Sequence, residues 1–471
     1  MKQKIVEELS KVEYVCTTAD IWSAHNRSFF GVTAHWIDPT TLTRRSAALA
    51  CSRMVGRHTF GSIAEQLHSV HSSFHIAWKV VMTVTDNASN FVKAFKEFAR
   101  TEDDDNDDDI DHEVMVHDVD NLLAADNDDD TLDVGIDEAL YLPPHQRCSS
   151  HTLNLVAVSD TEVANQDGNY KRISRATLSK CSALWNKTSR STVSADIVSE
   201  KLNTCFIVPN DTHWNSQYRA VEKIKKLLDQ QPEHMREICQ ALGVVPFNVN
   251  ETNFIREYCS VMQPLACALD ILQAETKCFI GYLLPTLSTL EMKLRALRSN
   301  LKVAAPLVDA ILTGLAKRFA GYQERQDLML ASITLPQFRF RWLDDSKKAS
   351  ARSLLYDMSR TVTAVSERAE DEPSPSQDDE FFTFMAQPEQ NESVTSEVDS
   401  YLSDPAKDLS SLHKYPGLLK LFLKFNTALP SSAPVERLFS LGARYLYRAV
   451  TACRMHTLNG NYCYVRTSCF S

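Results

Sequence analysis

A run of strand-like and helix-like segments near the start of the chain restricts its fold more than any other feature. Three segments rich in β-branched and aromatic residues are separated by polar turns, which is typical of strands. Apolar side chains then recur at helical spacing, on either side of a short apolar run. The predicted elements are strands over 13–20, 28–37 and 43–54, a helix over 59–74, a strand over 80–84 and a helix over 87–98.

This order, three antiparallel strands followed by a crossover helix and a further strand, predicts an α/β protein with the mixed sheet of an RNase H-like fold. Most of the chain between about 146 and 362 has the apolar period of helices. The predicted parts are a core over 1–100, an acidic disordered insertion over 101–138, a core helix over 139–160, a helical region over 161–365, a polar linker over 366–409 and a compact C-terminal segment over 410–471.

The net charge of −11 comes from one acidic tract. Residues 101–138 hold 18 of the 61 Asp and Glu residues and no Lys or Arg, so the other residues carry a net charge of +7. Such a tract cannot bury enough apolar surface to fold alone. A mildly basic body is compatible with a nucleic-acid partner, because phosphates attract Lys and Arg.

The cysteines and the apolar runs exclude two classes of protein. The 12 cysteines are scattered singly without a CxxC pair, so we expect reduced thiols and no structural zinc. No apolar run approaches the roughly 18 residues that a membrane helix needs, and the N-terminus does not resemble a signal peptide. We therefore expect a soluble intracellular protein with no membrane partner.

Three acidic residues are candidates for a metal site. Asp20 and Asp86 follow apolar strand segments, and Glu436 lies at the start of a late helix. Strands one and four are neighbours in an RNase H-like sheet, so the two aspartates can share a divalent cation such as Mg²⁺ or Mn²⁺. The alternative is that both aspartates only form turns or cap helices, and spacing alone favours this alternative.

Two further motifs have a structural and a functional interpretation. Cys148 and His151 are three residues apart on a predicted helix, where they either bind a metal or pack as a buried thiol beside a hydrogen-bonded histidine. Trp214 begins another helix, where it either packs or stacks on an extruded base. The packing interpretation is the commoner one for both motifs.

Six segments, in order along the chain, resemble the conserved blocks of the hAT (hobo, Ac and Tam3) transposases and their domesticated BED zinc-finger relatives. Asp20-Ile21-Trp22-Ser23 is similar to the first aspartate block, and the Phe30–Ile37 segment to the strand that follows it. Val84 to Asn90, with Asp86, Asn87 and Asn90, resembles the second aspartate block. The remaining segments are Cys148 to Leu155, which resembles the CxxH block, Thr212 to Ser216, with Trp214 and Asn215, which resembles the tryptophan motif, and Leu429 to Ser440, which resembles the glutamate segment.

The resemblance implies that Asp20, Asp86 and Glu436 form a DDE triad that binds Mg or Mn if the protein is active. It also implies that the helical region is an inserted domain, that Trp214 contacts DNA, and that residues 410–471 complete the core and form a homo-oligomer. The sequence departs from the family in three places. No BED finger precedes Asp20, His213 stands where the tryptophan motif usually has Arg, and the residues after Ser440 lack the expected charged helices.

Three functions are compatible with these features. The favoured hypothesis is a nuclear, transposase-derived protein that dimerises and binds DNA without independent transposition. The second is an active Mg/Mn-dependent transposase core that cuts and joins DNA. The third is a transcriptional or chromatin regulator that uses the fold as a scaffold.

Overall fold

A computed structural model describes residues 2–24, 27–54, 58–98, 140–209, 214–367 and 397–440. By their contacts, the residues form two compact units. The first unit consists of Met1–Trp36, Arg45–Arg147 and Pro434–Ser471, and the second of Ile37–Arg44 and Cys148–Ala433. The predicted acidic insertion over 101–138 and the residues after Ser440 lie outside the described residues.

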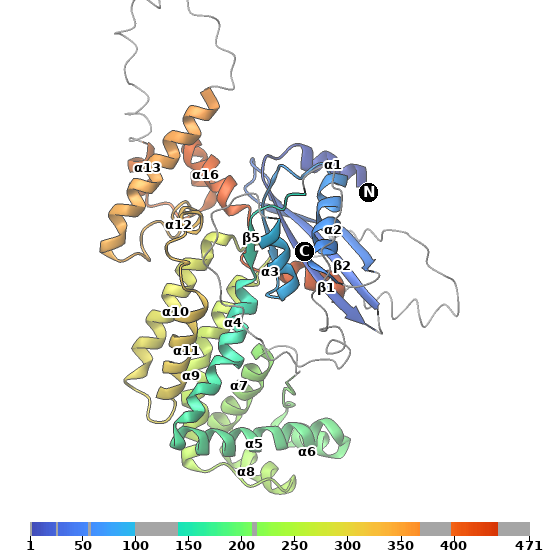
Figure 1. The fold of residues 1–471 in the computed structure, drawn as a ribbon. Helices are drawn as coiled ribbons and strands as arrows, with labels where there is room; N and C mark the ends of the chain where they lie inside the picture. The colour runs from blue at the N-terminus through green and yellow to red at the C-terminus, as the bar shows by residue number, and fades with distance from the viewer. Residues whose placement is uncertain are drawn as a thin grey trace, which may run out of the picture. The chain divides into compact units, whose positions relative to one another are not determined.

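The first unit is built on a five-stranded mixed sheet (Figure 1). Strand β1 runs antiparallel to β2 and parallel to β4, and β4 runs parallel to β5. The predicted α/β class with a mixed sheet is confirmed. The strands lie in the order β3-β2-β1-β4-β5 and span Val15–Ala24 (β1), Arg27–Ile37 (β2), Arg44–Met54 (β3), Val80–Thr85 (β4) and His145–Arg147 (β5).

Every strand and helix predicted before residue 98 is present, with ends that differ by a few residues. Helices α2 (Phe60–Ser73) and α3 (Ser89–Glu97) alternate with β4 as expected. Two elements were not predicted: α1 (Lys2–Ser10) and β5, whose three residues are too few to show a period. The Lys79 ammonium closes the end of α1 by donating to the carbonyl oxygens of Leu9, Ser10 and Val12 at 3.0, 3.0 and 2.8 Å.

Helices α2 and α3 cover one face of the sheet (Figure 1). The positions predicted from helical spacing supply the core, which includes the buried side chains Ile63, Ala64, Leu67, Phe91, Ala94 and Phe95. They pack against Ala19 of β1 and against Phe30 and Val32 of β2. Because successive side chains of a strand point to opposite faces, Asp20 and Gly31 belong to the other face.

The second unit is helical, which confirms the period read between 146 and 362. Among the described residues, its α-helices include α4 (Ser149–Val158), α5 (Gly168–Arg190), α6 (Thr192–Leu202), α7 (Trp214–Gln230), α8 (Pro232–Ala241), α9 (Val249–Leu272), α10 (Leu283–Arg298), α11 (Ala305–Arg318), α12 (Gln326–Ile333), α13 (Asp345–Glu367) and α16 (Pro416–Asn426). Short 3-10 helices span Asp160–Gln166 (η2), Ile280–Tyr282 (η3) and Leu409–Lys414 (η5).

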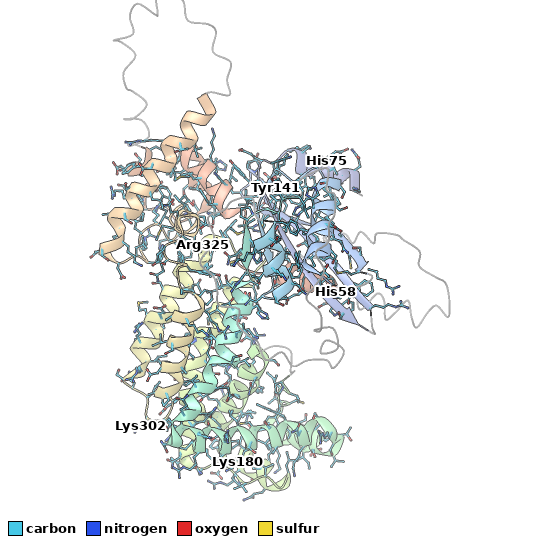
Figure 2. All side chains as sticks on the ribbon, in the orientation of Figure 1. His58, His75, Tyr141, Lys180, Lys302 and Arg325 are labelled. Carbon is cyan, nitrogen blue, oxygen red and sulfur yellow. The ribbon has the colours of Figure 1, made fainter. Side chains whose placement is uncertain are left out.

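Helices α4, α9, α10 and α11 pack side by side in this unit (Figure 1). Two largely buried ion pairs tie its segments together. Lys180, labelled in Figure 2, contacts Glu251 at 2.7 Å, and Arg318 contacts Asp160 at 2.7 Å. Among the described residues, none of the helices combines the length and apolar character that membrane crossing requires.

A second apolar core in this unit joins α12, α13 and α16. Tyr415, Leu418 and Phe422 of the predicted C-terminal segment are buried in it, so within the described residues these side chains are core. The predicted polar linker over 366–409 needs a correction at its end. Residues 397–403 are helical, and the Val398 and Tyr401 side chains are fully buried. Three apolar residues in a polar stretch, Val398, Tyr401 and Leu402, were too few to show a helical period.

A buried network of hydrogen bonds holds the C-terminal end of α16. The Asn426 side chain accepts the Gly281 N–H at 3.2 Å and donates to the Ala331 carbonyl at 2.9 Å. The buried Arg44 guanidinium donates to the carbonyls of Asn426, Thr427 and Ala428 at 2.7, 2.6 and 3.2 Å. These carbonyls have no partner inside the helix, so a cation placed there stabilises the helix end.

Candidate acidic site on the sheet

Asp20 and Asp86 lie on neighbouring parallel strands. The last residue pair between β1 and β4 is Ala19 with Thr85. Asp20 and Asp86 are the next residue of each chain segment, and parallel strands keep equivalent residues on the same face. The structure therefore brings the two predicted aspartates together.

Glu436 reaches the same face of the sheet on a helix from the other end of the chain. Residues 433–440 are helical, and Trp22 of β1 stacks on Phe439 of this helix with ring centroids 5.8 Å apart and planes 21° apart. On its other side Trp22 contacts Phe29 of β2 at 5.8 Å. The aromatic contacts anchor the 433–440 helix, and its second turn is exposed at Glu436.

The charges of the three acids act on one another. Burial raises the pKa of Asp20 well above its usual value, and the negative charge of Asp86 raises it further. The Ile21 N–H, which donates to Asp20 Oδ1 at 2.7 Å, opposes this rise, while Glu436 adds to it. Asp20 thus lies within the electrostatic range of both other acids.

Asp86 also has the local role that the alternative interpretation predicted. Its Oδ1 accepts the Ala88 N–H at 3.2 Å, which shapes the turn from β4 into α3. Asn87 lies in the same turn, and the Asn90 side chain donates to the carbonyl of His58 at 2.9 Å. A carboxylate oxygen has more than one lone pair, so an aspartate that accepts a hydrogen bond in a turn can also bind a cation, and the two roles are compatible.

The donor chemistry of this site suits a hard divalent cation. Carboxylate oxygens are the ligands that Mg²⁺ and Mn²⁺ prefer, and a cation offsets the mutual repulsion that raises the pKa of Asp20. In the described ranges, no three His, Cys, Asp or Glu side chains are already close enough together to hold a metal ion. Glu436 is exposed, so its side chain is the one with room to turn.

Cys148 is a buried thiol at the start of α4. Its sulfur accepts the N–H groups of His151 at 3.4 Å and Ser432 at 3.3 Å, and burial raises its pKa. The Ser149 N–H donates to the carbonyl of Pro430 at 2.8 Å. Cys148 therefore joins the start of α4 to the chain that leads into the 433–440 helix.

The tryptophan motif lies in the second unit. Helix α7 begins at Trp214, whose side chain lies outside the described residues. The Asn215 side chain donates to Asp270 of α9 at 2.8 Å, which attaches this end of α7 to α9. The contact of Trp214 with DNA stays a prediction.

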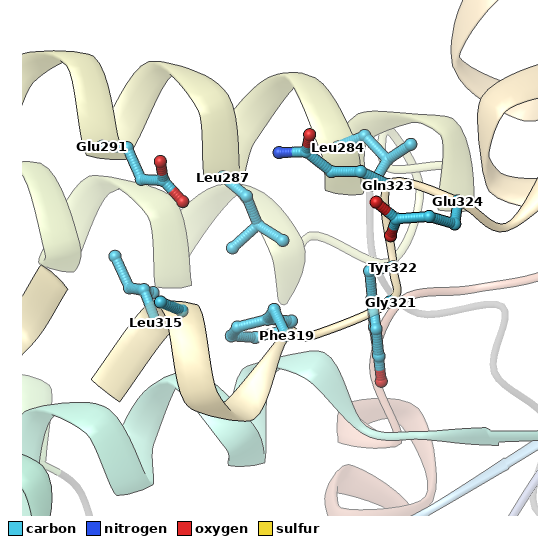
Figure 3. A pocket seen from close by; sticks show the side chains of 10 residues that line it. Leu284, Leu287, Glu291, Leu315, Phe319, Gly321, Tyr322, Gln323 and Glu324 are labelled. Atoms are coloured by element: carbon cyan, nitrogen blue, oxygen red, sulfur yellow. The ribbon is translucent and has the colours of Figure 1, made fainter. Parts of the chain in front are cut away.

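A pocket in the second unit contains none of the predicted site residues. It has a volume of about 170 Å³, and Leu287, Leu315 and Phe319 line it together with Glu291 and Glu324 (Figure 3). It is smaller than the roughly 300 Å³ typical of small-molecule sites. The acidic site on the sheet therefore remains the candidate functional site.

The sequence analysis did not identify Gly31 and Phe439 as parts of this site. Gly31 is paired with Asp20 in the sheet, and Phe439 lies against it. One signal was present, because a glycine inside a strand rich in β-branched and aromatic residues often marks a close approach of another segment. No pattern in the sequence pointed to Phe439.

Known proteins resemble parts of the chain. Residues 18–112 match the family model of the ZBED1 RNase-like domain, a range that includes Asp20 and Asp86. Two maize (Zea mays) proteins, "Putative AC transposase" and "Putative AC9 transposase", are each 27% identical to the chain over 221 residues, which is 46% of this chain. The matched region covers only 23% and 22% of the length of those two proteins.

These similarities agree with the order of the six blocks and with the mixed sheet that carries the two aspartates. Residues 18–112 are similar to an RNase-like domain, and part of the chain is similar to a transposase of Ac, one of the three elements after which the hAT group is named. The chain is a relative of the hAT transposases.

Proposed function

We propose that the first unit is a metal-dependent centre for phosphoryl transfer on DNA, with Asp20, Asp86 and Glu436 as the ligands of Mg²⁺ or Mn²⁺. The observation that supports it best is that Asp20 and Asp86 directly follow the last residue pair of the neighbouring parallel strands, Ala19 with Thr85. The charges of Asp86 and Glu436 also raise the pKa of Asp20. These three acids come from distant parts of the chain, and their negative charges repel one another on one face of the sheet. Such groupings occur preferentially at functional sites.

Each residue has a separate task in this proposal. The bound cations supply activation of a water or a DNA 3′-hydroxyl and stabilisation of the leaving oxygen. Asp20 and Asp86 are held by neighbouring strands, so they provide a rigid pair of oxygens. Glu436, which is exposed on its helix, would supply the third carboxylate to a bound cation.

DNA is the proposed partner, which also implies a nuclear location. Helix α5 has an exposed basic face formed by Lys171, Arg172 and Arg175, and in the described part of the chain none of the three forms an ion pair. The helix contains no Asp or Glu. Such a face suits the sequence-independent contacts that Lys and Arg make with phosphates.

A strand-transfer assay with Mn²⁺ and pre-cleaved DNA ends tests the proposed chemistry. We expect Asp86→Asn to reduce product formation at least about a hundredfold, because one anionic ligand is lost where charge develops. Asn retains an oxygen that accepts the Ala88 N–H, so the turn is preserved.

Asp38→Asn is the matched control. Asp38 is also a turn aspartate, accepting the N–H groups of Thr40 and Thr41 at 3.0 and 3.1 Å. It belongs to the second unit and is not a proposed ligand, so its activity should equal that of the wild type. Equal activity of Asp86→Asn and the wild type would remove the proposal.

Self-association through residues 410–471 is the second part of the proposal. The described part of this segment supplies buried core residues such as Leu418 and Leu421, so deleting all of it would unfold the second unit. A truncation after Ser440 spares that core. Light scattering should give a mass above 53.1 kDa for the full chain and a lower mass for the truncated one.

Equal masses for the two proteins would argue against an interface after Ser440. A monomeric full chain would remove the self-association proposal altogether. Neither result bears on the acidic site, because the strand-transfer assay tests that site separately.

A further inference from the structure

Gly31 occupies the one position of β2 that lies directly beside Asp20. The two residues are partners in the antiparallel register of β1 and β2. A Cβ atom added at Gly31 would lie 2.5 Å from Phe439 Cζ and 2.8 Å from Val435 Cγ2. Contacts between carbon atoms ordinarily begin near 3.4 Å, so no other residue fits without movement.

Space, rather than backbone conformation, requires this glycine. Gly31 lies inside a regular strand and does not have the positive φ that only glycine adopts readily. Its neighbours in the strand, Phe30 and Val32, have large side chains that lie on the opposite face of the sheet. A glycine weakens a strand, so its presence here needs a reason in the packing.

The reason lies in the 433–440 helix. Val435 and Phe439 are four residues apart and face the sheet together, while Glu436 is next to Val435 on the adjoining side. Trp22, two residues beyond Asp20 and on the same face, stacks on Phe439. Gly31 and Trp22 thus form the surface of the sheet against which the 433–440 helix packs.

We propose that Gly31 is a positioning residue for the metal site: its missing side chain sets the depth at which the 433–440 helix packs, and this depth sets how near Glu436 lies to Asp20. This role rests on the proposed function, because Gly31 would affect metal binding only through the position of Glu436. Gly31→Ala should lift the helix by roughly 1 Å, because the new methyl group meets ring atoms of Phe439.

The experiment measures the Mn²⁺ affinity of the full chain by electron paramagnetic resonance, without DNA. We expect Gly31→Ala to weaken binding about tenfold, the lower end of the effect of residues that orient metal ligands. Glu436→Gln should weaken binding to a similar degree. The double variant should bind Mn²⁺ no more weakly than either single variant, because a displaced Glu436 no longer contributes to binding and its removal has no further effect.

Gly61→Ala is the control, since no atom lies within 4 Å of a Cβ built at Gly61 on α2. Its Mn²⁺ affinity should be unchanged. Hydrogen exchange of residues 433–440, measured without metal, should be faster in Gly31→Ala and unchanged in Gly61→Ala. If Gly31→Ala does not fold, Phe439→Leu tests the same packing surface, because it removes the stack on Trp22. Combined with Glu436→Gln, it should likewise weaken Mn²⁺ binding no more than either single variant.

The outcomes separate this inference from the proposed function. If the wild type binds Mn²⁺ through Asp20 and Glu436 but Gly31→Ala binds equally well, only the inference is overturned. Additive losses in the double variant would also overturn it, because they would show that Gly31 acts independently of Glu436. If Asp20→Asn and Glu436→Gln leave Mn²⁺ binding unchanged, the proposed function itself is wrong.

Discussion

Asp20→Asn is expected to stabilise the folded protein while it abolishes strand transfer. The side chain is half-buried and near two other acids, so the folded state is destabilised whenever Asp20 is ionised. Asn has the same shape and no charge, which removes this cost. The melting temperature at neutral pH should therefore rise, by the equivalent of about 1.4 kcal/mol for each unit by which the folded pKa exceeds the unfolded one.

The pH dependence of this stabilisation has a definite sign. The pKa of Asp20 is raised in the folded state, so between the unfolded and the folded pKa the native protein binds more protons than the unfolded chain. The contribution of Asp20 to the free energy of unfolding is therefore fully present below the unfolded pKa, and it is lost as the pH rises through the folded pKa. The difference in melting temperature between Asp20→Asn and the wild type should therefore grow with pH over this window.

Glu65→Gln, at an exposed position on α2, is the control and should show no such trend. The loss of activity should match that of Asp86→Asn, at least about a hundredfold, because both variants remove one anionic ligand. A variant that is less stable than the wild type at neutral pH would contradict the burial of a charged group at this position. A variant that is more stable and fully active would contradict its role as a ligand.

Gly281→Ala should destabilise the second unit more than any other glycine substitution within the described residues. A Cβ atom there would lie 2.2 Å from the carbonyl oxygen of Ala331 and 2.7 Å from Asn426 Oδ1. The first neighbour is backbone and cannot rotate away, so η3 must move and the bond from the Gly281 N–H to Asn426 is lost. We expect a loss of about 3 kcal/mol in the free energy of unfolding, the upper end of ordinary overpacking.

Chemical denaturation monitored by circular dichroism measures this effect. Gly168→Ala is the matched control in the same unit, because no atom lies within 4 Å of its Cβ position at the start of α5. It should be neutral or stabilising by up to about 1 kcal/mol, since alanine favours a helix over glycine. Equal stabilities of the two variants would show that η3 and α12 pack less closely than described.

The period of the side chains and the turn chemistry were enough to predict most secondary structure. Residues 13–98 alternate apolar and polar positions in the way each strand and helix requires, and the second unit repeats its apolar residues at helical spacing. Asp20 and Asp86 were candidates because each follows an apolar segment in strands predicted to be neighbours, and the family resemblance then implied their role. In the structure Asp20 lies inside β1 and not at its end. Three elements were missed: α1, β5 and the 397–403 helix. The last two are too short or too sparsely apolar to show a period.

The tertiary structure alone decided how the third acid joins the first two. Glu436 is separated from Asp86 by the whole helical unit, and no local pattern encodes a contact over that distance. It depends on the missing side chain of Gly31 and on the stack of Trp22 and Phe439, which are properties of packing between distant segments. Local sequence determines which elements form, because their periods arise from backbone geometry, whereas close packing determines which side chains meet.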